Sequence, residues 1–244
     1  MEENTMQSKG ICKYCGKEYT RGGMLRHLAA CKTKKAVLAD EKAKTKCGYF
    51  QMVISDRFDN DYWLIIEINE NAKLKDLDQF LRDIWLECCG HLSGFEIGGT
   101  RYETMPDDDW FWGEPAKNMN YKVKTVLSVG DSFSYEYDYG STTELILKVQ
   151  SYRVGAKNKD NITILSRNNP PEIICSQCGI NKAQWIDPEE LFGEHPFWCE
   201  ACLEKAEEDT EFMLPVCNSP RMGVCGYEGS VRYDDQFAAD EIKK

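Results

Sequence analysis

The sequence predicts an α+β fold: a mostly antiparallel sheet with a packed helix, flanked by two small zinc modules. Three observations support this prediction. Cysteine and histidine residues with metal-ligand spacing occur near both ends of the chain. Between them, segments rich in aromatic and β-branched residues surround one segment with helical periodicity. The chain has 244 residues, which is enough for a central domain with its own apolar core beside the two modules.

These observations divide the chain into four parts. The predicted parts are a CCHC-type zinc finger at 1–34, a basic linker at 35–46, an α+β domain at 47–168, and a four-cysteine zinc module with a tail at 169–244.

The amino-terminal ligand set has the spacing C-x2-C-x11-H-x3-C. Its predicted ligands are Cys12, Cys15, His27 and Cys31. Residues four apart share a helix face, so the histidine and the last cysteine are expected on one helix, after a knuckle that carries the first two cysteines. Tyr19 and Leu25 are expected to pack beneath the metal, which replaces the core that so short a fragment lacks. Gly22 and Gly23 occupy the helix start, where DNA-reading fingers carry base-contacting side chains, and this disfavours sequence-specific reading.

The carboxyl-terminal set has the spacing C-x2-C-x20-C-x2-C. Its predicted ligands are Cys175, Cys178, Cys199 and Cys202. Each C-x-x-C pair presents two thiolates from one tight turn, and the second pair runs into a helix-forming stretch, as in a treble-clef or ribbon-like zinc module. His195, Cys217 and Cys225 remain as alternative ligands. The two complete sets predict two zinc ions, and Cys47, Cys88 and Cys89 are expected to bind none.

The central domain opens with two strand-like segments. Residues 48–54 and 62–68 are predicted to form an antiparallel pair around the polar turn 56–61. Apolar residues then recur at three- and four-residue steps, so 73–87 is predicted to be an amphipathic helix, with Asn71 as a possible cap.

The second half of this domain shows three further strand signals. Gly98-Gly99 predicts a hairpin turn within residues 95–102. Residues 132–140 alternate polar and aromatic side chains, and 143–152 place leucine and valine on one face, so both are predicted to be strands around a turn.

Several of these motifs together resemble a known family. Tyr62-Trp63, His91-Leu92, Phe95 to Gly99, and Phe133 to Gly140 are similar to the plasmid pRiA4b open-reading-frame-three-like family, over about residues 48 to 153. That family occurs on plasmids and mobile elements and has no established biochemical activity. The resemblance therefore implies a fold and a mobile-element setting, but no function.

The chain departs from the family pattern at polar positions. The family has a second histidine two residues after the first, where this chain has Ser93, and an acidic-Trp-His cluster after the turn, where it has Ser141, Thr143 and Leu145. The polar residues that remain are His91, Glu96, Asp138 and Glu144. We expect these four to satisfy hydrogen bonds at strand ends.

The charge distribution bears on partners. The formal net charge is −11, which argues against coating of nucleic acid or of an anionic membrane by the whole chain. Residues 9–46, however, carry eleven Lys or Arg against three Asp or Glu, a local charge of +8. This segment is either a solvated linker or an arm that contacts phosphate groups.

Enzyme signals are sparse. Asp107, Asp108, Asp109 and Glu114 offer carboxylates for a divalent cation, but beside Pro106 and Gly113 they are typical of a solvated loop. Trp110, Phe111 and Trp112 in the same loop cannot all enter one core. Cys88-Cys89 beside His91 is interpreted as a pair of thiols at a helix end. Phosphate-binding, dinucleotide-binding and nucleophile-elbow motifs are absent from the sequence.

The sequence thus favours a non-enzymatic, zinc-binding adaptor of mobile-element type that binds nucleic acid through residues 9–46, or a protein partner. The alternative is a metal-dependent hydrolase or nuclease that uses the central acids. The polar start of the chain lacks an apolar signal segment, so a reducing cytoplasm is expected, without membrane or small-molecule ligands.

Overall fold

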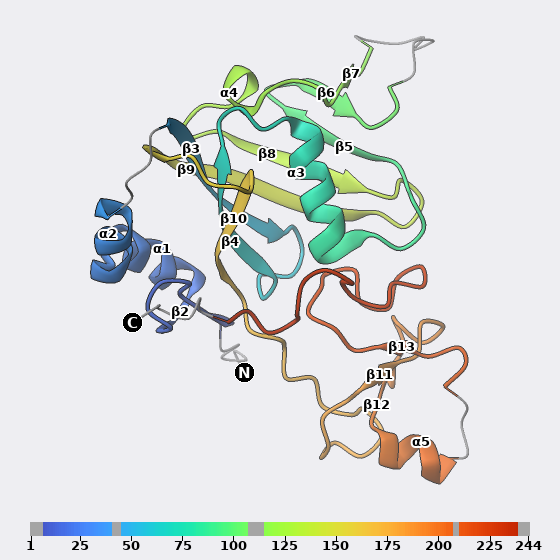
Figure 1. Ribbon diagram of the computed structural model, residues 1–244. Helices are drawn as coiled ribbons and strands as arrows, with labels where there is room; N and C mark the ends of the chain where they lie inside the picture. The colour runs from blue at the N-terminus through green and yellow to red at the C-terminus, as the bar shows by residue number, and fades with distance from the viewer. Residues whose placement is uncertain (1–6, 41–44, 107–114, 207–209, 239–244) are drawn as a thin grey trace, which may run out of the picture. The chain divides into compact units, whose positions relative to one another are not determined.

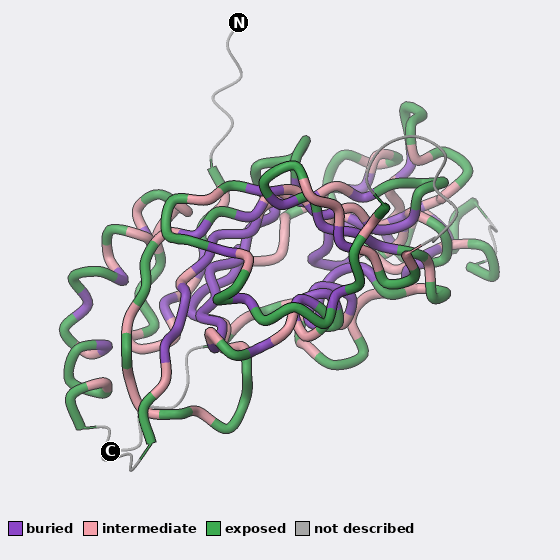
Figure 2. The backbone as a smooth tube through the Cα atoms, turned by 90° about the horizontal axis from the view of Figure 1, so that it is seen from above, coloured by how far each residue is buried: buried purple, intermediate pink, exposed green. Residues whose placement is uncertain are grey.

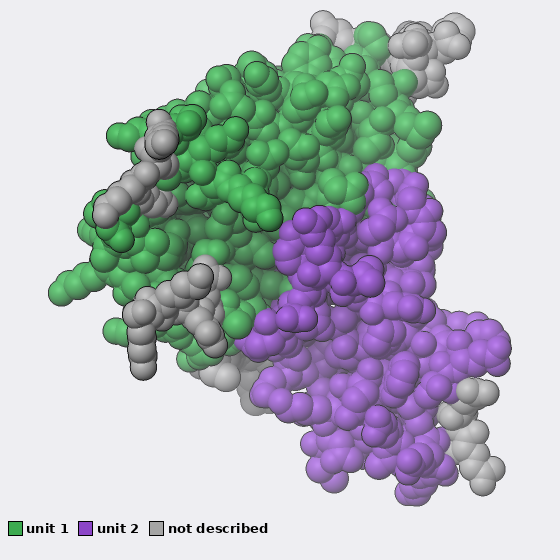
Figure 3. All heavy atoms as spheres, viewed as in Figure 1, with its two compact units in different colours: residues 1–80, 92–169, 237–244 green, residues 81–91, 170–236 purple. Residues whose placement is uncertain are grey.

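The computed structural model describes residues 7–40, 45–106, 115–206 and 210–238. These residues form two compact units (Figure 3). The first contains the described residues within 1–80, 92–169 and 237–244, and the second contains those within 81–91 and 170–236. The domain boundaries expected from the sequence stay a prediction.

An eight-stranded sheet forms the first unit (Figure 1). Its strand order is β10-β4-β3-β9-β8-β5-β6-β7. The strands are β3 (Lys46–Asp56), β4 (Trp63–Asn69), β5 (Ser93–Ile97), β6 (Thr100–Glu103), β7 (Lys117–Asn118), β8 (Ser132–Tyr137), β9 (Thr143–Ala156) and β10 (Ile162–Arg167). All neighbouring pairs are antiparallel except β6 and β7, so the predicted α+β class with a mostly antiparallel sheet is confirmed.

The predicted pair of β3 and β4 forms the middle of the buried region. Every residue of β4 is buried, which requires cover on both faces of the sheet because successive side chains point to opposite faces. Figure 2 colours the buried segments of the backbone purple. Strand β10, which the sequence analysis did not anticipate, pairs with the other edge of β4 from Ile162 to Arg167.

The predicted helix at 73–87 is present but changes its winding. Helix α3 (Leu74–Leu81) lies across the sheet and continues into the π-helix η1 (Arg82–Leu86) (Figure 1). Its apolar stripe is buried, as predicted. Asn71 does not cap the helix, since α3 starts only at Leu74 and the Lys73 amide donates to Asp76 Oδ2 at 2.9 Å.

The two predicted turns are also present. Gly98 and Gly99 have φ of 56° and 77°, as the tight turn between β5 and β6 requires. Asp138, with φ of 65°, turns the chain between β8 and β9, and its Oδ1 accepts the Gly140 amide at 3.0 Å. A short helix, α4 (Val123–Val126), precedes β8.

The amino-terminal finger packs onto the sheet. It consists of β1 (Lys9–Ile11), β2 (Glu18–Thr20), α1 (Arg21–Ala30) and α2 (Lys32–Ala39). Its buried Met24 and Leu28 join one apolar cluster with the sheet residues Val53, Trp63, Ile65 and Leu165. A Cβ atom at Gly10 would lie 2.1 Å from the Arg167 carbonyl oxygen, so this close approach requires glycine. The finger therefore covers part of the sheet and shares its core.

Besides η1, the described residues of the second unit form three two-residue strands and one short helix. The strands are β11 (Trp185–Ile186), β12 (Phe197–Trp198) and β13 (Leu214–Pro215), in the order β12-β11-β13, and the helix is α5 (Glu200–Ala206). Residues 81–91 are fixed to residues 214–236 by the hydroxyls of Ser219 and Ser230, which donate to the carbonyls of Trp85 and Asp83 at 2.6 Å each.

In the described part of the chain, every helix is too short or too polar to cross a membrane.

Candidate metal centres

Cysteine and histidine side chains gather at three places among the described residues. All twelve cysteines lie among these residues, and none of them forms a disulfide bond. Ten of them and two histidines form three four-residue groups, and within each group the ligand atoms all lie within 4.8 Å of one another. The groups are Cys12, Cys15, His27 and Cys31; Cys88, Cys89, His91 and Cys225; and Cys175, Cys178, Cys199 and Cys202. The structure brings together both predicted sets and adds one that the sequence analysis missed.

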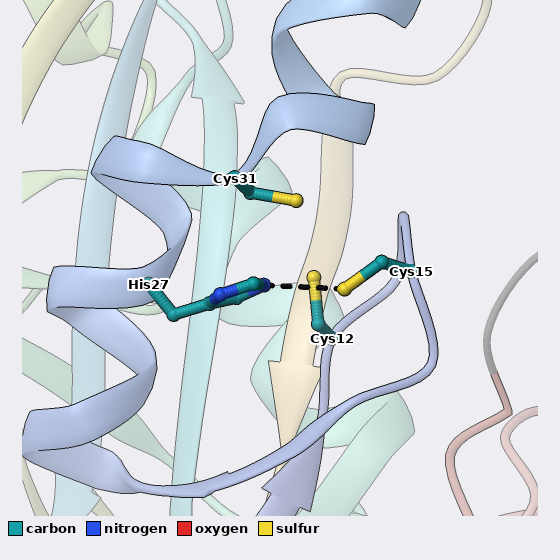
Figure 4. A group of neighbouring side chains, drawn as sticks. All are labelled: Cys12, Cys15, His27 and Cys31. Atoms are coloured by element: carbon teal, nitrogen blue, oxygen red, sulfur yellow. Dashed lines mark hydrogen bonds between the residues drawn. The ribbon is translucent and has the colours of Figure 1, made fainter.

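The finger group is built by a knuckle and a helix end (Figure 4). Cys12 and Cys15 follow β1, His27 lies in α1, and Cys31 follows that helix directly. His27 Nε2 lies 3.2 Å from Cys15 Sγ, and its ring stacks on Tyr19 with 4.4 Å between ring centroids. Tyr19 and Leu25 pack at the edge of the core, while Met24 and Leu28 fill its centre. All four side chains therefore point into one small space.

The ionisation of this group suits a cation. Burial raises the pKa of the Cys12 thiol to about 11, so ionisation there is unfavourable without a positive charge nearby. Burial and the Lys17 charge lower the pKa of His27, which keeps its imidazole neutral and able to ligate. A bound cation would stabilise the Cys12 thiolate, and the neutral imidazole of His27 could ligate it without losing a proton.

The carboxyl-terminal group combines a knuckle with a helix start. Cys175 and Cys178 lie in a turn that ends at Gly179, whose φ is 65°. Cys199 directly precedes α5 and Cys202 lies in its first turn, with Cys199 Sγ 3.9 Å from Cys178 Sγ. The Asn181 side chain donates to Cys199 Sγ at 3.5 Å. The local order is thus knuckle, β11–β12 hairpin and helix.

Two thiols in this group are shifted in opposite directions. The backbone amides of Asn181 and Ile180 donate to Cys178 and lower its pKa to about 6. Burial and the neighbouring thiols of Cys199 and Cys175 raise the pKa of Cys202 to about 12. Four thiolates this close cannot all be charged without a cation between them, so the arrangement suits a divalent ion with soft ligands.

The third group joins residues that are distant in the sequence. Three of its residues, Cys88, Cys89 and His91, follow η1, so the two thiols lie at a helix end as predicted. The fourth residue, Cys225, comes 136 residues after Cys89 in the sequence. The sequence analysis considered Cys225 only as a substitute ligand for the carboxyl-terminal set. The available signal was a surplus of cysteines beside a histidine, since a C-C-x-H segment has none of the usual ligand spacing.

The other candidate residues lie outside these groups. The His195 side chain is 62% exposed and lies 4.0 Å from Glu194. Cys217 and Cys47 belong to none of the three groups. Glu144 forms an ion pair with Arg57 at 2.6 Å, and the Asp138 side chain accepts a hydrogen bond within the turn after β8. Both residues therefore have structural roles, as expected. Glu96 is exposed. Among the described residues, carboxylates do not form a metal-ligating group.

The acidic and aromatic loop lies outside the described residues. It comprises Asp107, Asp108, Asp109, Trp110, Phe111, Trp112 and Glu114.

Comparison with known proteins identifies the family. A family model described as plasmid pRiA4b ORF-3-like protein matches residues 52–183, more than half of the 244 residues. The match ends beyond the expected residue 153 and includes Cys175 and Cys178. A crystal structure of a protein of unknown function from Methanosarcina mazei Go1 aligns with 50% of this chain and 68% of its own, with 15% identity and a TM-score of 0.39. No curated protein matches the chain. Most of the residues that carried the resemblance lie in strands and turns of the central sheet, and the chain belongs to the plasmid pRiA4b ORF-3-like protein family.

Proposed function

We propose that this protein is a non-enzymatic adaptor, stabilised by zinc, whose finger binds the phosphate backbone of nucleic acid without sequence preference. The observation that carries the proposal is that both terminal groups supply four protein ligands each. Four ligands complete the tetrahedron of a structural zinc site, whereas a catalytic site keeps one position for water or substrate.

The donor sets favour zinc over other divalent ions. The finger group offers three thiolates and one imidazole, and the carboxyl-terminal group offers four thiolates. Magnesium and calcium prefer oxygen ligands, while tetrahedral sulfur and nitrogen sites suit zinc. The knuckle, hairpin and helix around the four cysteines support a treble-clef module there.

The finger supplies an exposed set of basic side chains. Its exposed basic residues are Lys9, Lys17, Arg26, Lys32 and Lys35. Lys34 is not part of this set, because it is buried and forms an ion pair with Glu67 Oε1 at 3.2 Å. Burial raises the pKa of Glu67, but the Arg153 and Lys34 charges hold it below its usual value, so the carboxylate keeps its charge and retains Lys34.

The packing of the finger supports backbone contact over base reading. Helix α1 begins Arg21-Gly22-Gly23, and the Arg21 guanidinium donates to Asn60 Oδ1 at 3.2 Å. Met24 and Leu28 of the same helix are buried against the sheet. Few side chains at the helix start therefore remain for base edges, while five exposed cations can contact phosphates.

Replacing these five basic residues by glutamine tests the proposal. If each contacts a phosphate, binding of the full chain to duplex DNA depends on salt with a log–log slope of about −4 to −5. The substituted protein is expected to lose most of its affinity and nearly all of this slope. Fluorescence anisotropy with two unrelated duplexes at several salt concentrations measures both quantities and tests sequence preference.

The matched control replaces five exposed lysines outside the finger. They are Lys75, Lys117, Lys122, Lys124 and Lys148. The control variant changes the net charge of the protein by the same amount, so any effect of net charge alone is equal in the two variants. The control is expected to retain most of the salt dependence of DNA binding. If both variants lose the same DNA affinity, or if the parent chain does not bind DNA, the finger is not a nucleic-acid-binding surface. A protein partner would then be the remaining hypothesis. Substitution is preferable to deleting the finger, because deletion exposes Trp63.

A further inference from the structure

We propose that Cys88, Cys89, His91 and Cys225 form a third zinc site, which joins the loop after η1 to the carboxyl-terminal segment. This site is independent of the proposed binding function. It raises the expected number of zinc ions from the two predicted by the sequence to three.

The distances within the group fit a tetrahedral ion. Cys89 Sγ lies 3.5 Å from Cys88 Sγ and 3.6 Å from Cys225 Sγ. His91 Nε2 lies 3.0 Å from Cys89 Sγ and 3.2 Å from Cys225 Sγ. Ligands of one zinc ion are about 3.8 Å apart for two sulfurs and about 3.6 Å for sulfur and nitrogen, given the usual bond lengths. Small adjustments would therefore admit the ion.

Hydrogen bonds from neighbouring residues hold the loop that carries the first three ligands. Gly90, with φ of 75°, reverses the chain between Cys89 and His91, and its amide donates to Glu87 Oε1 at 2.6 Å. Arg82 binds the same Glu87 carboxylate at 2.8 Å and donates to the His91 carbonyl at 2.7 Å. Arg82 of η1 and Glu87, which follows η1, thus hold the short ligand loop in place.

The fourth ligand comes from a turn with unusual backbone geometry. Cys225 has φ of 51°, and the glycines on either side, Gly223 and Gly226, have φ of 78° and 69°. A non-glycine residue with positive φ is strained, and such residues cluster at functional sites. The Ser219 hydroxyl, which donates to the Trp85 carbonyl, fixes the start of this segment beside η1.

Charge around the group is balanced for a zinc ion. Three thiolates and one divalent ion carry a net charge of −1. The buried Arg221 guanidinium donates to Cys88 Sγ at 3.6 Å and supplies one positive charge. Donors that approach ligand sulfurs in this way are typical of the surroundings of metal sites.

Exposure makes the proposal testable by alkylation. Cys89 and Cys225 are both exposed, so iodoacetamide can reach both thiols. As zinc ligands they are expected to resist alkylation in the full chain until a strong chelator removes the metal. Mass spectrometry of digested protein, labelled before and after chelation, measures the reaction at each cysteine, and zinc analysis of the same sample should give three ions.

Variants separate this site from the other two. Cys225→Ser and His91→Ala are expected to lower the zinc content by one ion and to make Cys88 and Cys89 react without chelator. Cys47→Ser, which changes a cysteine outside the three groups, should leave three ions.

Either of two outcomes overturns the proposal. One is immediate alkylation of Cys89 and Cys225 in parent protein that contains two zinc ions. The other is protection that only a reductant removes, which would mean a disulfide. Both readouts come from the parent chain, so they hold even if a variant fails to fold.

Discussion

Replacing both Cys199 and Cys202 by serine is expected to unfold the carboxyl-terminal module while the central sheet stays folded. In its described residues the module has two-residue strands and one short helix, and few of its apolar side chains are buried, among them Ile186 and Leu203. So small a core cannot offset the conformational entropy of folding, and zinc binding contributes about 10–16 kcal/mol in small zinc-dependent folds.

Hydrogen exchange with mass spectrometry provides the measurement. Peptides around Trp185 and Trp198 should lose protection in the variant, while peptides from β3 and β4 keep theirs, because those strands belong to a separate apolar core. The matched control is His195→Ala, a change at an exposed residue of the same module that belongs to none of the three groups. Unchanged protection around Trp185 in the cysteine variant would show that these thiols do not hold a structural ion.

Replacing Trp63 by alanine is expected to lower the free energy of unfolding by about 3–5 kcal/mol and to release the finger from the sheet. Trp63 is fully buried, lies in the cluster shared by Met24 and Leu28, and donates from Nε1 to Ser8 Oγ at 2.8 Å. The change therefore removes the largest apolar contact between the finger and the strands, along with one hydrogen bond.

Chemical denaturation and limited proteolysis test this expectation together. Proteolysis should begin in residues 7–40 of the variant, because the finger has lost the surface it packs on. Phe58→Ala, at an aromatic residue that is 76% exposed, should change stability by less than about 0.5 kcal/mol. If both substitutions have the same small effect, the finger does not depend on the sheet for its position.

The sequence predicted the parts of the fold whose signals are local. Alternating side chains marked β8 and β9, and the pair Gly98-Gly99 marked a turn that requires positive φ. Strand β10 has the residues of a strand, Ile162 to Leu165, but its place beside β4 is a long-range pairing that local pattern does not specify. The change to π-helical winding after Leu81 likewise had no distinct signal in the apolar stripe.

The candidate metal groups also differ in whether their signals are local or long-range. Each terminal group gathers the four residues that the sequence spacing pairs, because each ligand pair is separated by a short spacing set by a knuckle or a helix, and their role as metal ligands stays a prediction. The third group needs Cys225 to reach Cys89 through tertiary structure, which spacing cannot reveal. The docked finger was missed for a similar reason, since nothing in its sequence pairs Met24 or Lys34 with the sheet residues that they contact.

Native mass spectrometry of the freshly purified full chain tests the central claim, that the two terminal groups hold structural zinc, most directly. The parent is compared with Cys12→Ser/Cys15→Ser, with Cys199→Ser/Cys202→Ser, and with the combination of all four changes. Each pair of changes is expected to lower the number of bound zinc ions by one, and the combination by two, because each removes half the ligands of one tetrahedral site. A parent chain without zinc, or variants that bind as many ions as the parent, would contradict the account.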